Sequence, residues 1–200
     1  MTRPIRGPPF SKGSAIDEQL DEATQVALRA RRGYAAAASA LVRATQADVW
    51  RLCAHLGSRP GADDLTQETY ARAFASLHRF QARSSARTWL LSIARRVCAD
   101  AVRSAVRSRA VEMLTESPAE LAARRGGADH AHTVTLDALL GALDDQRREA
   151  FVLTQLVGLS YAEAAAVCSC PIGTIRSRVA RARAELVAAF GIGQARAGTG

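Results

Sequence analysis

Large apolar residues recur through this chain at the spacing of an amphipathic α-helix, and no stretch alternates apolar and polar residues as a half-buried strand does. Leu90, Ile93, Val97 and Ala101 fall at i, i+3, i+7 and i+11 and therefore share one face of a helix. Aromatic residues are only 5% of the chain, so its cores must be built from Leu, Val, Ile and Ala, the usual material of helical bundles. The pattern predicts an all-α fold.

One long segment interrupts the helical pattern. Residues 108–133 hold few large apolar side chains, one proline, a glycine pair and mixed charge, which is typical of a linker between domains. We expect at most a short helical piece there, at 119–125. The sequence therefore predicts two small helical domains joined by a flexible linker. The first domain is expected at residues 17–107, the linker at 108–133 and the second domain at 134–190, with disordered tails at 1–16 and 191–200.

Turn residues divide the first predicted domain. Gly33 breaks the pattern, the glycine- and proline-containing stretch 57–61 is a turn, and 79–85 is a loop rich in Arg and Ser. The predicted helices lie at residues 17–31, 34–56, 62–77 and 86–107.

The charge of the chain favours a polyanionic partner. The 27 basic residues outnumber the 19 acidic ones, giving a net charge of +8, and Lys12 is the only lysine. A guanidinium binds phosphate through two parallel donors. A GC-rich coding bias is an alternative source of the arginines, but it does not explain the net charge, so nucleic acid is the favoured partner.

Neither a membrane nor a small molecule is an expected partner. No apolar run reaches the roughly 18 residues of a membrane span, and the basic N-terminus has no apolar core of a secretory signal. We therefore expect a cytoplasmic protein with reduced cysteines. Cys168 and Cys170 have no second ligand pair at zinc-site spacing, and the histidines lie in unrelated contexts. We expect no enzymatic activity, no metal and no cofactor.

The most specific local signal is a short helix, a tight turn and a second, basic helix. Ser160 and Glu163 form a capping box that starts a helix at Tyr161. Pro171 cannot lie inside a helix, so the second helix should begin near Thr174. This arrangement places the second helix in the major groove of DNA.

The second helix has an apolar side and a basic side. At about 100° per residue, Ile175, Val179, Ala182 and Leu186 form one stripe that should face the core. Small residues surrounded by arginines on the other side suit a groove about 12 Å wide; a solvated arginine face is the alternative. The candidate DNA-contacting residues are Thr174, Arg176, Ser177, Arg178, Ala180, Arg181 and Arg183.

Five short motifs carry a family resemblance. They are DLTQET, RTWL, REAF, GLSY and GTIRSR, at residues 64–69, 87–90, 148–151, 158–161 and 173–178. In this order they resemble the extracytoplasmic-function (ECF) sigma factors of the sigma-70 family, most closely the actinobacterial sigma-C type. The resemblance extends over about residues 20–190. It implies a region 2-like bundle followed by a region 4-like helix-turn-helix domain.

The resemblance also implies a function and partners. A sigma factor binds core RNA polymerase, recognises the −10 and −35 promoter elements and directs transcription initiation. The implied partners are promoter DNA, the clamp helices of the largest polymerase subunit, the flap of the second subunit and, in some members, an anti-sigma factor. The runner-up function is a stand-alone helix-turn-helix regulator with a helical sensing domain.

Two groups of residues in the first domain match functional motifs of the family. The acidic and amide residues Asp64, Gln67 and Glu68 lie on the helix side away from Tyr70 and Phe74 and would dock on the polymerase. The residues implied in −10 recognition and melting are Phe80, Arg83, Ser84, Ser85, Arg87, Trp89, Arg95 and Arg96.

The chain also departs from the family pattern. The loop after Phe80 lacks a second aromatic residue, and Arg96 stands where many relatives have Asn. Both Phe80 and Trp89 have an alternative role, as core residues between helices. Ser169 replaces the usual turn glycine, a change without cost only if its backbone avoids positive φ.

Overall fold

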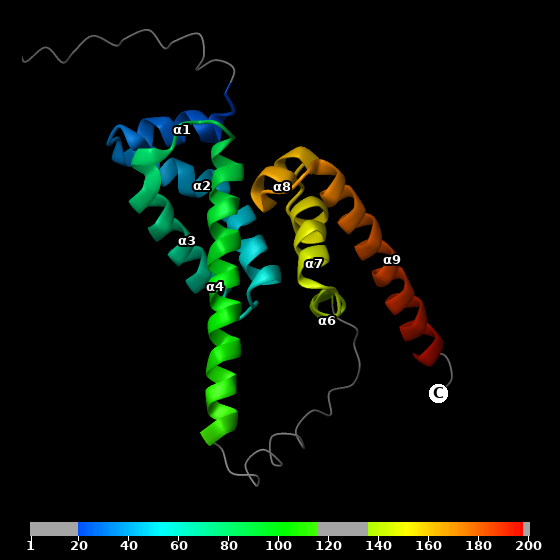
Figure 1. Cartoon of the computed structure of the whole chain (residues 1–200). Coiled ribbons are helices and arrows are strands. Elements are labelled where there is room, and N and C mark those ends of the chain that lie inside the picture. Colours follow the sequence, from blue (N-terminus) through cyan, green and yellow to red (C-terminus); the bar gives the residue numbers. More distant parts are fainter. Residues whose placement is uncertain (1–19, 116–135, 198–200) are drawn as a thin grey trace, which may run out of the picture.

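The computed structural model describes residues 20–115 and 136–197, and all regular elements in these ranges are helical, which confirms the predicted all-α fold. Figure 1 shows two groups of helices side by side. The N-terminal domain contains α1 (Glu22–Arg31), α2 (Ala35–Leu56), α3 (Ala62–Ser76), the 3-10 turn η2 (Leu77–Arg79) and α4 (Ala86–Thr115). The C-terminal domain contains α6 (Leu136–Gly141), α7 (Asp145–Phe151), the π-helical turn η3 (Val152–Leu156), α8 (Tyr161–Cys168) and α9 (Ile172–Ala197).

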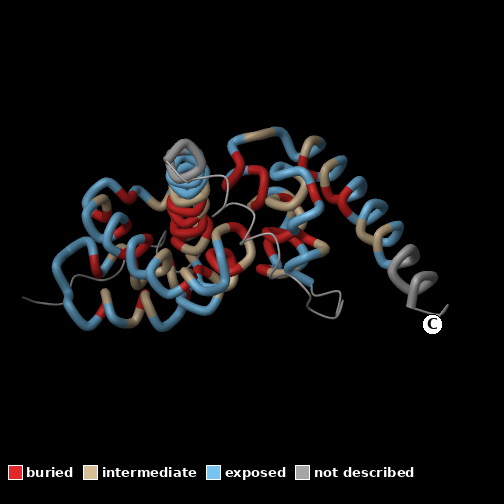
Figure 2. The backbone as a smooth tube through the Cα atoms, turned by 90° about the horizontal axis from the view of Figure 1, so that it is seen from below, coloured by how far each residue is buried: buried red, intermediate tan, exposed pale blue. Residues whose placement is uncertain are grey.

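The long helix α4 forms the centre of the N-terminal domain and packs against α1, α2 and α3. Leu90, Ile93 and Val97 of the predicted stripe are buried, and Ala101 is half-buried near the edge of the domain. Buried residues therefore follow the part of α4 that the other helices surround, as Figure 2 shows in red. The continuous apolar stripe in the sequence is the reason that this helix occupies the middle position.

The C-terminal domain is a compact helix-turn-helix unit. The Ser160 hydroxyl accepts a hydrogen bond from the Glu163 backbone N–H (3.2 Å), and the Glu163 carboxylate accepts one from the Ser160 backbone N–H (2.9 Å). This reciprocal capping box starts α8 at the predicted residue, Tyr161. Ala164 and Ala165 are buried, and α8 packs against both α9 and α4.

The two domains contact each other. Helix α8 lies against α4, and η3 lies against α2. At the C-terminal end of α2, Asp137 of α6 is 3.0 Å from Nδ1 of His55 and 3.5 Å from the Arg59 guanidinium. No helix within the described ranges is long and apolar enough to cross a membrane.

Several helix boundaries differ from those predicted. Helix α1 begins at Glu22, because Asp21 caps its N-terminus by accepting a hydrogen bond from the backbone N–H of Thr24 (3.1 Å). Helix α4 continues to Thr115, past the predicted end at 107, since no glycine or proline occurs there.

Helix α9 begins at Ile172, directly after Pro171, and extends to Ala197 instead of ending at 190. Glycines weaken a helix but do not by themselves end one. The predicted tail 1–16 and the short helical piece at 119–125 lie outside the described residues.

The turn between α8 and α9 contains a strained residue. Ser169, which stands in place of the usual glycine, has φ 53° and ψ 46°, in the left-handed region. The serine therefore does not avoid positive φ, and its Cβ adds about 1–2 kcal/mol of backbone strain in this region. The turn is retained because the Cys170 backbone N–H still donates to the Ala165 carbonyl (3.1 Å) and closes the end of α8.

We expect Ser169→Gly to raise the free energy of unfolding by about 0.5–1 kcal/mol, because glycine adopts positive φ without strain but gains freedom in the unfolded chain. Thermal unfolding followed by circular dichroism measures the change. Ser104→Gly, on an exposed ordinary turn of α4, is the matched control and should lower stability. A Ser169→Gly protein less stable than the parent would contradict the left-handed turn.

Candidate nucleic-acid interface

The apolar stripe of α9 faces the core as the sequence predicts. Ile175, Val179 and Ala182 are buried, and Leu186 is half-buried. The helix is therefore fixed in rotation about its own axis, and this fixes which side chains point outward. The exposed predicted contact residues are Arg176, Ser177, Ala180, Arg181 and Arg183, while Thr174 and Arg178 are half-buried.

The arginines of α9 differ in how far they are committed to the protein. Arg178 donates to the side-chain oxygen of Gln146 (2.6 Å), and Arg183 donates to that of Gln155 (2.6 Å). Arg176 and Arg181 make no hydrogen bond or ion pair with any residue that the structure describes. These two guanidinium groups are therefore available to bases or phosphates without first leaving a protein partner.

The predicted docking residues lie together on the exposed face of α3. Asp64, Gln67 and Glu68 are all exposed. Glu68 forms an ion pair with Arg72 (2.7 Å), and Arg72 also pairs with Asp100 of α4 (2.8 Å). Both acids hold the pKa of the Arg72 guanidinium above its usual value. The face remains acidic, because one arginine is shared between two carboxylates.

The opposite face of α3 is only partly buried. Tyr70 is buried and its hydroxyl lies 2.7 Å from that of Thr45, but Phe74 is 38% exposed beside it. The two rings are 6.1 Å apart between centroids. The face opposite the docking residues is therefore partly open to solvent at Phe74.

A shallow groove next to Gln67 was not indicated by any motif in the sequence. Trp50 of α2 is 37% exposed there, and its indole N–H donates to the Asp63 carboxylate (2.8 Å). Thr66 and Gln67 of α3 line the same groove. A partly exposed tryptophan with a polar tip is typical of a protein interface. The helical pattern of α2 could not identify this groove, because the sequence alone does not distinguish Trp50 from an apolar residue of the core.

The loop between η2 and α4 has a buried start and an exposed middle. The Phe80 ring is only 4% exposed and lies 4.9 Å from the half-buried Trp89 ring, centroid to centroid. Arg83 and Ser84 are exposed. In this conformation Phe80 is packed as a core residue, which is the alternative role expected for it. The exposed loop residues are those that a DNA strand could reach.

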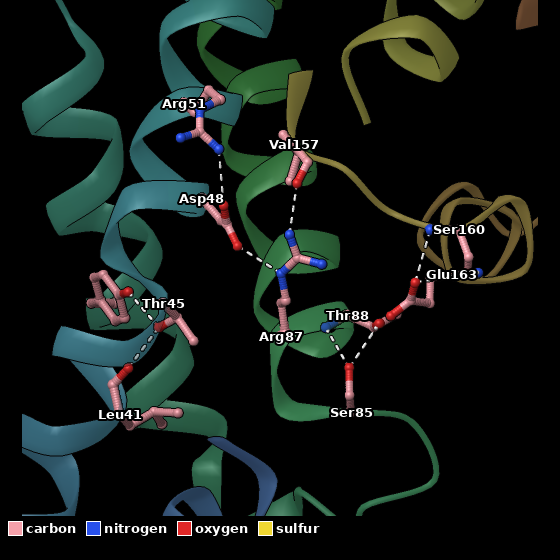
Figure 3. A network of polar contacts seen from close by, with 11 residues as sticks. Leu41, Thr45, Asp48, Arg51, Ser85, Arg87, Thr88, Val157, Ser160 and Glu163 are labelled. Atoms are coloured by element: carbon pink, nitrogen blue, oxygen red, sulfur yellow. Dashed lines mark hydrogen bonds and ion pairs between the residues drawn. The ribbon is translucent and has the colours of Figure 1, made fainter. Parts of the chain in front are cut away.

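The residues at the start of α4 are held by hydrogen bonds. Ser85 caps the helix, its hydroxyl accepting from the Thr88 backbone N–H (3.1 Å). Arg87 donates to the Asp48 carboxylate of α2 (2.6 Å) and to the carbonyl of Val157 in the C-terminal domain (2.7 Å), as Figure 3 shows. One guanidinium therefore links the predicted melting helix α4 both to α2 and to the C-terminal domain.

A second contact between the domains involves another predicted melting residue. Arg95 forms an ion pair with Glu149 of α7, and the other Glu149 oxygen accepts a hydrogen bond from the Cys168 thiol (3.5 Å). Burial and the Glu149 charge raise the pKa of Cys168 to about 12, so the thiol stays protonated. Arg96, one residue further on, is exposed. Within the described ranges, no three His, Cys, Asp or Glu side chains gather as metal ligands.

A helix-turn-helix unit with free arginines on its second helix, joined to a second helical domain, defines a two-domain DNA-binding protein. Comparison with protein families identifies both domains: residues 41–108 match Sigma-70 region 2, and residues 133–186 match Sigma-70, region 4. The chain belongs to the ECF RNA polymerase sigma factors of the sigma-70 family.

Individual relatives agree with this family. The ECF RNA polymerase sigma factor SigC of Mycobacterium tuberculosis is 53% identical over 173 residues, which cover 84% of this chain and 91% of that protein. The sigma factor EcfG of Rhodopseudomonas palustris is 41% identical over 133 residues, 66% of this chain and 72% of that protein. The solved structure of CnrH in complex with the cytosolic domain of CnrY superposes with a TM-score of 0.66 at 28% identity and covers 86% of this chain and 99% of that one.

The family establishes the general function. The chain is an RNA polymerase sigma factor, which binds core polymerase, recognises the −10 and −35 promoter elements and directs transcription initiation. A stand-alone helix-turn-helix regulator is disfavoured, because such a protein has no need of region 2. Proteins of this family are not enzymes in general.

The geometry of α9 predicts which changes affect DNA and which affect folding. Arg176→Ala and Arg181→Ala should each weaken binding to the −35 duplex, by about 1–3 kcal/mol for an arginine that reads a base. Val179→Ala removes buried apolar atoms and should instead lower thermal stability. Fluorescence anisotropy with labelled duplex separates the two effects, and unchanged affinity in both arginine variants would mean that this face is only solvated.

Proposed function

We propose that each sigma function of this chain is carried by a separate surface. The acidic face of α3 docks on the clamp helices of the largest polymerase subunit. The loop before α4 and the start of α4 capture the melted −10 strand. Helix α9 reads the −35 duplex, and the C-terminal domain also contacts the flap of the second subunit. The chain catalyses no reaction of its own.

The observation that carries this proposal is the separation of charge between the exposed surfaces. Asp64 and Glu68 are exposed on α3, where negative charge repels DNA phosphates and attracts a basic protein helix. Arg176 and Arg181 are exposed on α9, where positive charge attracts phosphates. The two surfaces therefore suit two different partners, a protein and a nucleic acid.

Trp50 supports the docking surface as an addition to the predicted residues. Its exposed ring lies in the groove lined by Gln67, so a helix seated on the acidic face of α3 would also cover apolar surface. Tryptophan is among the residues that contribute most to protein interfaces when it is buried by a partner.

The melting surface requires an exchange of partners. Arg87 and Arg95 now bind the Val157 carbonyl and the Glu149 carboxylate of the C-terminal domain. To contact strand phosphates, both guanidinium groups must leave these protein acceptors. We propose that the domains separate when the chain binds polymerase and that the arginines then bind DNA.

The family supports one further partner and the compartment. The solved RpoE of Bartonella quintana, 32% identical to this chain with a TM-score of 0.51, is in complex with the anti-sigma factor NepR. An anti-sigma factor is therefore a proposed partner of this chain too. Because the polymerase and the chromosome are its main partners, the chain acts in the cytoplasm.

Docking can be tested by charge reversal on α3. Glu68→Lys and Gln67→Arg should abolish co-purification with core polymerase, because each adds a positive charge to the acidic face. Exposed substitutions change stability by less than about 0.5 kcal/mol, so helical content should stay normal. Glu22→Lys changes an acid on α1 that is also exposed; it is the control and should still co-purify. Normal binding by both α3 variants would refute this docking surface.

Melting can be tested on the exposed part of the loop. Arg83→Ala should leave closed-complex binding nearly normal but slow open-complex formation, which permanganate reactivity of unpaired thymines reports, and a pre-melted template should rescue it. Arg107→Ala, an exposed residue in the C-terminal third of α4, is the control.

Phe80→Ala distinguishes the two roles of Phe80. A wall of the strand pocket predicts rescue by the pre-melted template. A core residue predicts a loss of about 3–5 kcal/mol of stability and no rescue.

A further inference from the structure

We infer that α1 positions the melting loop by holding both of its ends, which makes Thr24 and Arg31 positioning residues for DNA strand separation. Helix α1 lies outside residues 41–108, the part that matches Sigma-70 region 2. The inference rests on the proposed role of the loop in capturing the −10 strand.

Thr24 holds the end of the loop at the start of α4. Its side chain is fully buried, and its hydroxyl oxygen accepts a hydrogen bond from the Ala86 backbone N–H (2.7 Å). The same hydroxyl donates its single proton to the Asp21 carboxylate (2.5 Å), so its lone pairs are directed at Ala86. A residue 62 positions upstream thus caps the first N–H group of α4.

Arg31 holds the other end of the loop. Its guanidinium donates to the backbone carbonyl of Phe80 (2.6 Å), and the Phe80 backbone N–H donates to the Leu77 carbonyl of η2 (3.0 Å). Both backbone groups of Phe80 are therefore bound, and α1 and η2 are in contact. A hydrogen bond from a charged donor is stronger than one between neutral groups.

The residue between these two contacts is strained. Ala82 has φ 51°, a conformation that residues with a Cβ rarely adopt. Such a residue persists only where the surrounding structure determines its conformation. The contacts at Phe80 and Ala86 supply this constraint, and Arg83 and Ser84 are presented to solvent from within the constrained segment.

A loop fixed in advance captures a strand better than a free one. If the loop had to become ordered when the strand arrives, the ordering would reduce the favourable free energy of capture. Helix α1 does not need to touch DNA for this effect. Loss of its two contacts should slow strand capture while leaving polymerase docking and −35 reading unchanged.

The experiment compares open-complex formation by full-length variants bound to core polymerase. Thr24→Val removes the acceptor at nearly constant shape, and Arg31→Met removes the donor but keeps the stem. Each should slow permanganate-detected melting of duplex promoter by about 5–10-fold, the effect of one hydrogen bond. Thr24→Ser keeps the hydroxyl, and Arg32→Met removes the neighbouring exposed arginine; both should stay near the parent rate.

A third variant distinguishes positioning from mere stability. Ala82→Gly removes the strain and frees the loop, so it should be at least as stable to heat as the parent and yet melt promoter DNA more slowly. A general loss of folding would move both quantities in the same direction.

The outcomes separate this inference from the function on which it rests. The role of α1 would be overturned if promoter DNA melted at the parent rate with Thr24→Val, Arg31→Met and Ala82→Gly but slowly with Arg83→Ala. The role of the loop would then remain intact. Parental melting by Arg83→Ala as well would show that the loop itself does not capture the strand. Slow melting by all four variants, with normal polymerase binding, supports both.

Discussion

The packing of α4 determines where the proposed promoter-melting residues on this helix, Arg87, Trp89, Arg95 and Arg96, lie. Leu90, Leu91, Ala94 and Val97 are almost completely buried, and this surface is covered by α1, α2 and α3 on one side and by α8 on the other. Because these contacts fix both the position and the rotation of the helix, the polar residues between them have little freedom. The α4 part of the proposed strand-capturing surface is thereby placed on a rigid element, which is how binding groups are held to within fractions of an ångström.

The fold also keeps opposite charges apart. The acidic face of α3 and the arginine face of α9 are on different domains. Acidic residues form individual ion pairs with arginines, such as Glu68 with Arg72 and Glu149 with Arg95. A protein that must bind both a polymerase and a nucleic acid benefits from this separation, since each partner then meets a surface of the opposite sign.

The all-α fold, the helix-turn-helix and the buried stripe of α9 could be predicted because each depends on periodicity or capping within a short stretch, as with Ile175 and Val179 or Ser160 and Glu163. The hydrogen bond from the Ala86 N–H to the Thr24 hydroxyl and the ion pair of Arg95 with Glu149 could not be predicted, because each joins residues far apart in the chain. Backbone strain at Ala82 was equally hidden, because alanine carries no local sign that the surrounding structure will force positive φ. At Ser169 the missing turn glycine indicated where strain could arise, but the sign of φ came only from the structure.

The ion pair between Arg95 and Glu149 has a consequence for the response of the protein to salt. Dissolved ions screen the attraction of arginine for phosphate, and binding to DNA therefore weakens as salt rises. The same ions weaken an ion pair that is partly open to water, as this one is. If Arg95 leaves Glu149 and binds a phosphate, added salt weakens both the ion pair that is lost and the contact that is gained. The proposed −10 contact of Arg95 should then depend less on ionic strength than the proposed −35 contacts of Arg176 and Arg181, which have no protein partner to leave among the described residues.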